Sequence, residues 1–195
     1  MPDQALLTGE ALPLDLVNTR PADAEGRADL LATPRQLADW LALQADRLGG
    51  EVRGAAPTGA DLAPVHAVRA HAEAALRALL EGTPPPKPAL RALTEAQRAA
   101  PSVRELHWNG TEVTAVPRRT GPLGVRLAAL LAEATAELLA APGAGRLKQC
   151  EDADCVLLFL PAHPRRRWCS PSRCGNRNRV ARYYRRHHRP DATES

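Results

Sequence analysis

Apolar residues recur at helical spacing along most of the first 145 residues. In the stretch Thr33–Gln44, for example, Leu37, Trp40 and Leu41 fall at i, i+3 and i+4, the spacing of a helix with one buried face. A threonine followed by a proline opens this stretch, which suits an N-cap and a first helical position. The pair Gly49-Gly50 is expected to end the helix.

The same spacing predicts further helices in this part of the chain. The proline-rich segment Thr83–Pro88 separates two of these predicted helices. It cannot continue a helix, because proline lacks the backbone donor and its ring collides with the preceding turn. The earlier apolar run Glu10–Thr19 is too short for periodicity to separate strand from helix. The predicted helices cover about Asp61–Glu81, Ala89–Ala100 and Leu123–Ala141.

The pattern changes to alternation between residues 102 and 116. Two alternating runs flank Asn109-Gly110, and Asn-Gly in that position is the strongest short-range signal of a β-hairpin. We therefore expect strands over Ser102–Trp108 and Thr111–Val116. With alanine and leucine supplying much of the apolar 44%, the predicted fold class is α+β but mainly α: a helical domain with one hairpin.

Charge divides the chain into two parts. Residues 1–145 carry 14 Lys and Arg against 17 Asp and Glu, whereas residues 146–195 carry 12 against 5. A slightly acidic helical domain (1–145) is thus followed by a small, strongly basic domain (146–195), which indicates an anionic polymer as partner.

All the cysteines lie in the basic part, with the spacing C-x4-C-x13-C-x4-C. Clustered cysteines with turn-rich gaps are typical of a tetrahedral zinc site, so we expect one structural Zn²⁺. Disulfides or free thiols are the alternatives, and reduced thiols in the cytoplasm disfavour the former. A site filled by four protein ligands has no open position for metal-centred hydrolysis. The expected ligands are Cys150, Cys155, Cys169 and Cys174.

Between the cysteine pairs, "VLLFL", "PAHP" and "RRRW" suggest a strand, a turn and a second strand. This hairpin would bring the pairs together and would place Arg165, Arg166 and Arg167 on its second strand.

A basic helix is expected to follow, with Asn176 as its N-cap. At 100° per residue, Val180, Tyr183 and Tyr184 share one stripe, which we expect to pack on the zinc module, and the arginines share another. Some arginines could serve only to balance the charge of the zinc-bound thiolates; the remainder suit phosphate. The predicted nucleic-acid contacts are Arg165, Arg166, Arg167, Asn176, Arg177, Arg179, Arg182, Arg185, Arg186 and Arg189.

The segment from Arg165 to Arg186 closely resembles the CGNR zinc finger, named for the motif that stands here at Cys174–Arg177. "LDLVNT" (Leu14–Thr19) and "LLATPRQLADWL" (Leu30–Leu41) resemble the start of the ABATE domain, which usually precedes that finger. The resemblance implies a zinc-dependent, DNA-binding bacterial transcription regulator associated with stress responses. It carries over the four cysteines as ligands, and implies a small treble-clef-like finger built from a hairpin and the basic helix.

The leading hypothesis is therefore a zinc-dependent regulator that binds double-stranded DNA, whose N-terminal domain senses a small-molecule effector or forms a homodimer. The alternative is an RNA-binding protein, since arginine-rich helices also bind RNA. No nucleophile–base arrangement is visible, and His66 and His71 diverge on their helix, so we expect no enzyme. Without a signal sequence or an apolar span, a cytoplasmic, nucleoid-associated protein is expected, with no membrane contact.

Overall fold

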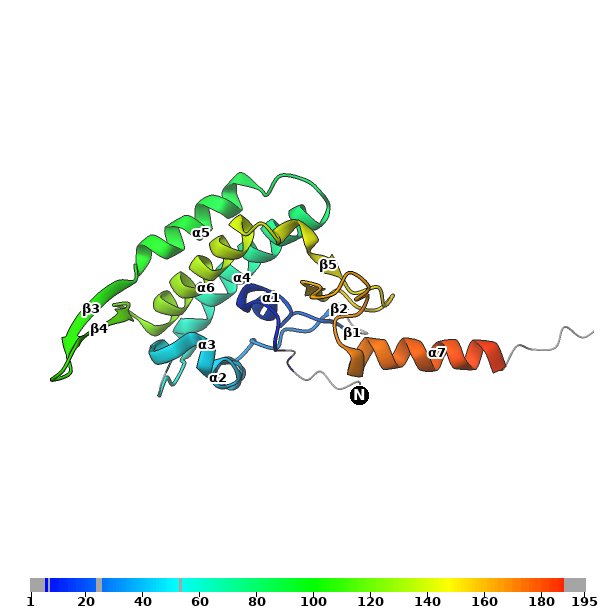
Figure 1. The fold of residues 1–195 in the computed structure, drawn as a ribbon, viewed down its shortest axis with the longest axis horizontal. Coiled ribbons are helices and arrows are strands. Elements are labelled where there is room, and N and C mark those ends of the chain that lie inside the picture. The colour runs from blue at the N-terminus through cyan, green and yellow to red at the C-terminus, as the bar shows by residue number, and fades with distance from the viewer. Residues whose placement is uncertain (1–5, 7, 24–25, 53, 188–195) are drawn as a thin grey trace, which may run out of the picture.

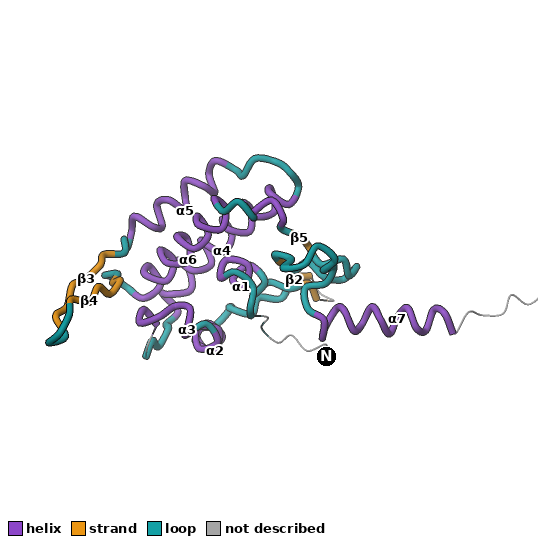
Figure 2. The backbone as a smooth tube through the Cα atoms, in the orientation of Figure 1, coloured by secondary structure: helices purple, strands orange, loops and turns teal. Residues whose placement is uncertain are grey.

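The computed structural model describes residues 6, 8–23, 26–52 and 54–187 (Figures 1 and 2). The α-helices are α1 (Leu12–Val17), α2 (Pro34–Leu43), α3 (Ala45–Leu48), α4 (Gly59–Leu80), α5 (Lys87–Ala99), α6 (Leu123–Ala140) and α7 (Asn176–His187). Single turns of other helical types are η1 (Gly49–Val52), η2 (Ala144–Arg146) and η3 (Pro171–Gly175). Strands pair antiparallel as β1 (Ala22–Asp23) with β2 (Gly26–Arg27), β3 (Val103–Trp108) with β4 (Val113–Arg118), and β5 (Lys148–Gln149) with β6 (Leu158–Phe159).

The long helices α4, α5 and α6 pack side by side, and the short α1 lies against α4 and α6 (Figure 1). Trp40 of α2 is fully buried in the core that they share. The mainly helical fold is therefore confirmed, and Trp40 serves packing, as large buried aromatic residues commonly do. Other buried members of this core are Leu16, Leu31, Leu37, Val65, Leu127 and Leu131.

The start of α2 agrees with its sequence signal. The Thr33 hydroxyl accepts from the backbone N–H of Gln36 at 3.3 Å, and the Gln36 side chain accepts from the Thr33 N–H at 2.9 Å, which makes a capping box. The helix ends at Leu43, however, before the expected glycine pair. The buried side chain of Gln44 turns back to donate to Asp15 at 3.1 Å, and the short α3 follows.

The hairpin of the helical domain forms where alternation predicts it, but its second strand begins two residues later than expected. The side chain of Asn109 accepts from the backbone N–H groups of Thr111 and Glu112 at 2.9 and 3.0 Å. Thr111 and Glu112 therefore belong to the turn, and β4 starts at Val113. All side chains of β3 are exposed, and Figure 1 shows the hairpin extending beyond the end of the helical bundle.

The predicted strand over Arg165–Trp168 is wrong. The apolar run Val156–Leu160 supplies β6, but β6 pairs with β5, which precedes the first cysteine, and the bond from Cys150 N–H to Leu157 O extends the ladder. The hairpin thus encloses the first cysteine pair instead of joining the two pairs. Arg165–Trp168 forms an irregular segment, tied back by a single backbone bond from Glu151 N–H to Arg167 O.

Two expectations for the basic helix are also wrong. Asn176 has helical backbone angles, and Ser170 caps this end instead, accepting from the N–H groups of Ser172 and Arg173. Val180, Tyr183 and Tyr184 are 45%, 60% and 56% exposed, so their stripe does not pack on the zinc module. The reason is that α7 is bonded to the finger through Arg177 and Asn178 of its first turn and then runs away from the body (Figure 1).

Within the described residues, no helix has both the length and the apolar character needed to cross a membrane.

Candidate metal centre and nucleic-acid interface

The four cysteines converge on one buried point. Cys150 and Cys155 flank the turn that follows β5, Cys169 follows the irregular arginine segment, and Cys174 lies in η3. Their Sγ atoms all lie within 4.8 Å of one another, and every one of the four side chains is buried. The four cysteines are free, with no disulfide among them.

The sulfur positions fit one tetrahedral zinc ion. With Zn–S bonds of about 2.3 Å, the sulfurs of a four-thiolate site lie about 3.8 Å apart. The separation is 3.8 Å between Cys155 and Cys169 and 3.6 Å between Cys169 and Cys174. The four cysteines are thus placed to bind a single structural Zn²⁺, as expected.

The four thiols perturb one another's pKa values. Hydrogen bonds with Cys155 and Cys169 lower the pKa of the Cys150 thiol to about 2, whereas the pKa values of the other three thiols are raised. Burial raises the pKa of the Cys174 thiol to about 12, with the nearby Cys155 adding to the shift. The pKa of Cys169 is also raised, because its thiol is hydrogen-bonded to Cys150 and Cys155. A Zn²⁺ ion held by these four cysteines would bind all of them as thiolates.

Groups around the sulfurs hold the second cysteine pair and the start of α7 in place. The Cys169 N–H donates to the Cys150 sulfur at 3.3 Å. Arg177 makes a two-point contact with the buried carboxylate of Asp152, and its guanidinium also lies 3.7 Å from the Cys174 sulfur. Asn178 bonds Asp152 as well, and donates to Cys174 O at 3.0 Å. The hydrogen bonds that Arg177 donates to the Asp152 carboxylate raise the pKa of Arg177 further.

The CGNR motif therefore has a structural explanation at three of its positions. Cys174 is a ligand, and Arg177 fixes the helix to the turn that carries the first ligand pair. At Gly175 an added Cβ would lie 3.3 Å from Ser170 O and 3.4 Å from the Trp168 ring, so a larger residue would crowd both. Asn176 is exposed at the surface.

An open groove of about 270 Å³ lies between the irregular segment and α7. We call it the arginine groove; its lining residues are Arg165, Arg166, Arg167, Trp168, Pro171, Gly175, Arg179 and Arg182. It therefore brings together five of the predicted nucleic-acid contacts, from two segments that are separate in sequence.

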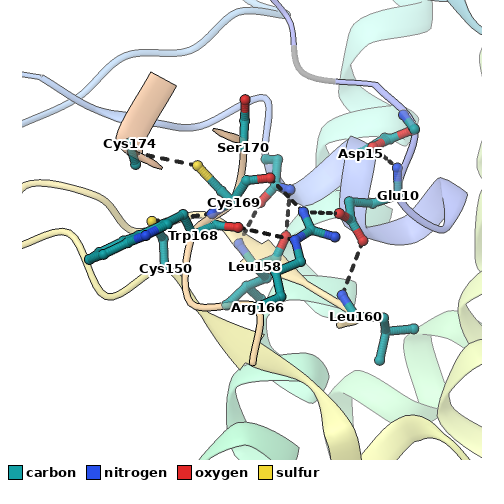
Figure 3. Close-up of polar contacts among 12 residues, drawn as sticks. Glu10, Asp15, Cys150, Leu158, Leu160, Arg166, Trp168, Cys169, Ser170 and Cys174 are labelled. Atoms are coloured by element: carbon teal, nitrogen blue, oxygen red, sulfur yellow. Dashed lines mark hydrogen bonds and ion pairs between the residues drawn. The ribbon is translucent and has the colours of Figure 1, made fainter. Parts of the chain in front are cut away.

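The arginines of the groove differ in what else they contact. Arg166 donates to Glu10 at 2.6 Å and to Cys169 O at 2.5 Å (Figure 3). Its guanidinium also lies 4.3 Å from the centre of the Phe159 ring. Arg167 pairs with Glu151 at 2.5 Å. By contrast, Arg165 and Arg179 are exposed and form no ion pair with any residue in the described ranges.

The remaining predicted contacts lie outside the groove. Arg186 is exposed further along α7, and Arg177 is held by Asp152. The side chain of Arg185 and the whole of Arg189 lie outside the part of the chain that the structure describes.

Contacts across 140 residues of sequence attach the zinc finger to the helical domain. The Asn18 side chain donates to Leu158 O and accepts from Leu158 N–H, both at 2.8 Å. It therefore makes the two backbone hydrogen bonds that a neighbouring strand would make with β6. Glu10 accepts from Leu160 N–H at 3.0 Å with the carboxylate that also binds Arg166 (Figure 3). The role of Asn18 is thus to satisfy buried backbone groups of the finger.

Two residues that hold the site together carry no sequence signal of such a role. Glu10 lies in the first apolar run, far in sequence from the finger it binds. Asp152 follows Cys150 by two residues and would be taken for a turn residue, since Asp is common in turns. Only the tertiary fold shows that both carboxylates are arginine partners.

Fold and site together define a helical domain fused to a four-cysteine zinc finger. Residues 10–142 match the family model ABATE, described as "Putative stress-induced transcription regulator", and residues 146–187 match the model of the CGNR zinc finger. The chain belongs to the ABATE family and carries a CGNR zinc finger, which confirms both resemblances. A comparison with curated proteins finds no match.

Proposed function

We propose that this protein is a zinc-dependent transcription regulator that binds double-stranded DNA through the arginine groove. The observation that carries the proposal is the groove itself, where the irregular segment and α7 present five arginines at one surface. Three of these have exposed side chains without a carboxylate partner among the described residues, namely Arg165, Arg179 and Arg182. Such an arrangement suits phosphate, because guanidinium groups donate in pairs to phosphate oxygens.

In this proposal the zinc ion acts by positioning. It holds Cys169 and Cys174, which fix the two sides of the groove, while Arg177 and Asn178 set the direction of α7. The chain works by binding and not by catalysis. We further propose that it acts at the bacterial nucleoid and that the helical domain supplies sensing or assembly.

The test is a titration of zinc-loaded protein against labelled duplex DNA over a range of salt concentrations. The double variant R179Q/R182Q should reduce the slope of log K against log salt by about 2, because two phosphate contacts are lost. The matched control R35Q/R91Q removes two exposed arginines from the helical domain and should leave the slope unchanged. Equal loss in both variants, or no duplex binding by the wild type at low salt, would contradict the proposal.

RNA binding is the second candidate, favoured by the exposed tyrosines. Tyr183 and Tyr184 stand on the same helix as Arg179 and Arg182 and are more than half exposed, and tyrosine rings stack on unpaired bases. Competition between a duplex DNA and a structured RNA separates the candidates. If Y183A/Y184A weakens RNA binding about tenfold or more and leaves DNA binding unchanged, RNA is the ligand.

A further inference from the structure

We propose that two copies of this chain assemble through the outer edge of strand β3, forming an antiparallel four-stranded sheet in the order β4–β3–β3–β4. This assembly gives a specific form to the assembly role proposed for the helical domain, and it does not depend on DNA binding. It rests on the hairpin at the opposite end of the molecule from the basic helix (Figure 1).

The hairpin is exposed and apolar on one face. Cross-strand pairing places Leu106 opposite Ala115 and Trp108 opposite Val113, all on the same side of the hairpin. Leu106, Trp108 and Val113 are 70%, 66% and 63% exposed. An isolated two-stranded hairpin is marginally stable in water, whereas a wider sheet that buries such side chains is stable.

The two edges of the hairpin differ. The bond from Asn109 N–H to Glu112 O (3.1 Å) sets the alternation of the ladder, so the backbone groups of residues 104, 106 and 108 point outward from β3. On β4 the outward positions are 113, 115 and 117, and Pro117 has no N–H to offer there. The edge of β4 is therefore blocked, while that of β3 keeps every donor and acceptor.

No described residue bonds the outward backbone groups of β3. Unpaired edges of this kind pair readily with another strand.

The sequence of β3 is complementary to itself about Leu106. Antiparallel pairing centred there puts Arg104 opposite Trp108 of the second copy, a cation facing an aromatic ring. On the other face it puts Glu105 opposite His107, a carboxylate facing an imidazole. Centring the pairing on Arg104 or Glu105 would oppose identical charges, and centring it further along would shorten the paired segment.

The two copies are related by a two-fold axis, because each uses the same strand in the contact. No unpaired β3 edge then remains to add a third copy. The occupant of the edge is therefore a second copy of this chain, and the expected product is a dimer. Its two zinc fingers lie at the ends remote from the new sheet.

The test is the mass of the full zinc-loaded chain, measured by light scattering during size-exclusion chromatography over a wide concentration range. The wild type should give twice the chain mass of 21.0 kDa. L106P should give a monomer, because proline removes an outward donor of β3 and no ladder bond to β4. The matched control A115P makes the same change at the cross-strand partner on the blocked edge, and should remain a dimer.

A wild type that stays monomeric at every concentration, or an L106P variant that stays dimeric, overturns the proposal. If L106P fails to fold, as judged by circular dichroism and zinc content, substitutions at the Glu105–His107 pair provide the test. E105K/H107K and H107E should each lose the dimer alone, since each brings like charges together at positions 105 and 107 of the two copies. Mixed, they should form a heterodimer, because lysine then faces glutamate. A mixture that gives no heterodimer contradicts the register and with it the proposal.

Discussion

At the scale of single residues, Asn18 does the most to join the two parts of the molecule. It is 6% exposed and satisfies both backbone groups of Leu158 on the side of β6 that faces away from β5. Replacing it with alanine would leave a buried donor and a buried acceptor without partners. Each such group costs about 1–3 kcal/mol.

We therefore expect N18A to lower the free energy of unfolding by about 2–5 kcal/mol, measured by urea denaturation of the zinc-loaded protein. T94A is the control, because the Thr94 hydroxyl bonds a backbone carbonyl at an exposed site, and its loss should cost less than about 0.5 kcal/mol. Equal stability of N18A and the wild type would show that water or a shifted side chain replaces the amide.

The sequence gives no direct sign of this role for Asn18. An asparagine after an apolar run has many uses, and its partner lies 140 residues away. The zinc ligands, by contrast, could be predicted, because chemistry restricts four clustered cysteines to very few roles. The partners of the arginines could not, because Glu10 and Asp152 resemble ordinary surface carboxylates until the fold brings them near.

At the scale of elements, one carboxylate links the starts of α4 and α6. Asp61 accepts from the Thr58 N–H and hydroxyl at 2.8 and 2.7 Å, completing a capping box, and from the Gly124 N–H at 2.7 Å. The helices approach closely there, since a Cβ on Gly124 would lie only 2.6 Å from the Asp61 Cα. Burial raises the pKa of Asp61, but these hydrogen bonds outweigh it, and the pKa falls below 3.8.

This linkage predicts a pH-dependent contribution to stability. A carboxyl whose pKa is lowered by folding stabilises the protein above the pKa of the unfolded chain, and the contribution is lost as the pH falls through the folded pKa. D61N should therefore lower the free energy of unfolding by about 2 kcal/mol at neutral pH. The reason is that an amide has one oxygen and cannot accept from both Thr58 and Gly124. Below pH 3.8 the gap between D61N and the wild type should narrow in chemical denaturation. A gap that stays constant down to the acid transition would mean that the charge of Asp61 contributes nothing.

Elements set by local signals could be predicted, and those set by distant partners could not. The periodicity of the long helices, the proline breaks and the Asn109-Gly110 turn all act within a few residues. The long helices and the hairpin strands therefore begin and end within two residues of the expected positions, although α5 starts at Lys87 and so takes Pro88 into its first turn. Two segments could pair with β6, the one before Cys150 and the one at Arg165–Trp168, and local sequence does not distinguish them. The short segment before Cys150 provides the partner, leaving Arg165–Trp168 irregular around the zinc site. Amphipathic spacing on α7 also failed to predict packing, because the side chains of its apolar stripe stay about half exposed instead of being buried on the zinc finger.

At the scale of the whole molecule, the helical domain and the zinc finger share a hydrophobic core. Leu14 and Val17 of α1 and Leu76 of α4 pack with Leu147 and Leu158 of the finger, all of them buried. The change in charge near residue 145 therefore marks a boundary of composition and not of packing. The zinc site should support the helical domain as well as the finger, since β6 follows the first ligand pair by three residues.

Removing the metal should consequently loosen α1. With a strong zinc chelator, or in C169S, we expect amide hydrogen exchange over Leu14–Asn18 to speed up by about tenfold or more, equivalent to about 1.4 kcal/mol of local stability. The reason is that Asn18 and the shared core lose an ordered β6 to pack on. Mass spectrometry of exchanged peptides measures this, with the β3–β4 hairpin as the internal control, since it lies far from the finger (Figure 1). Unchanged exchange in α1 would show that β6 stays ordered without the metal and that the shared core alone holds the finger in place.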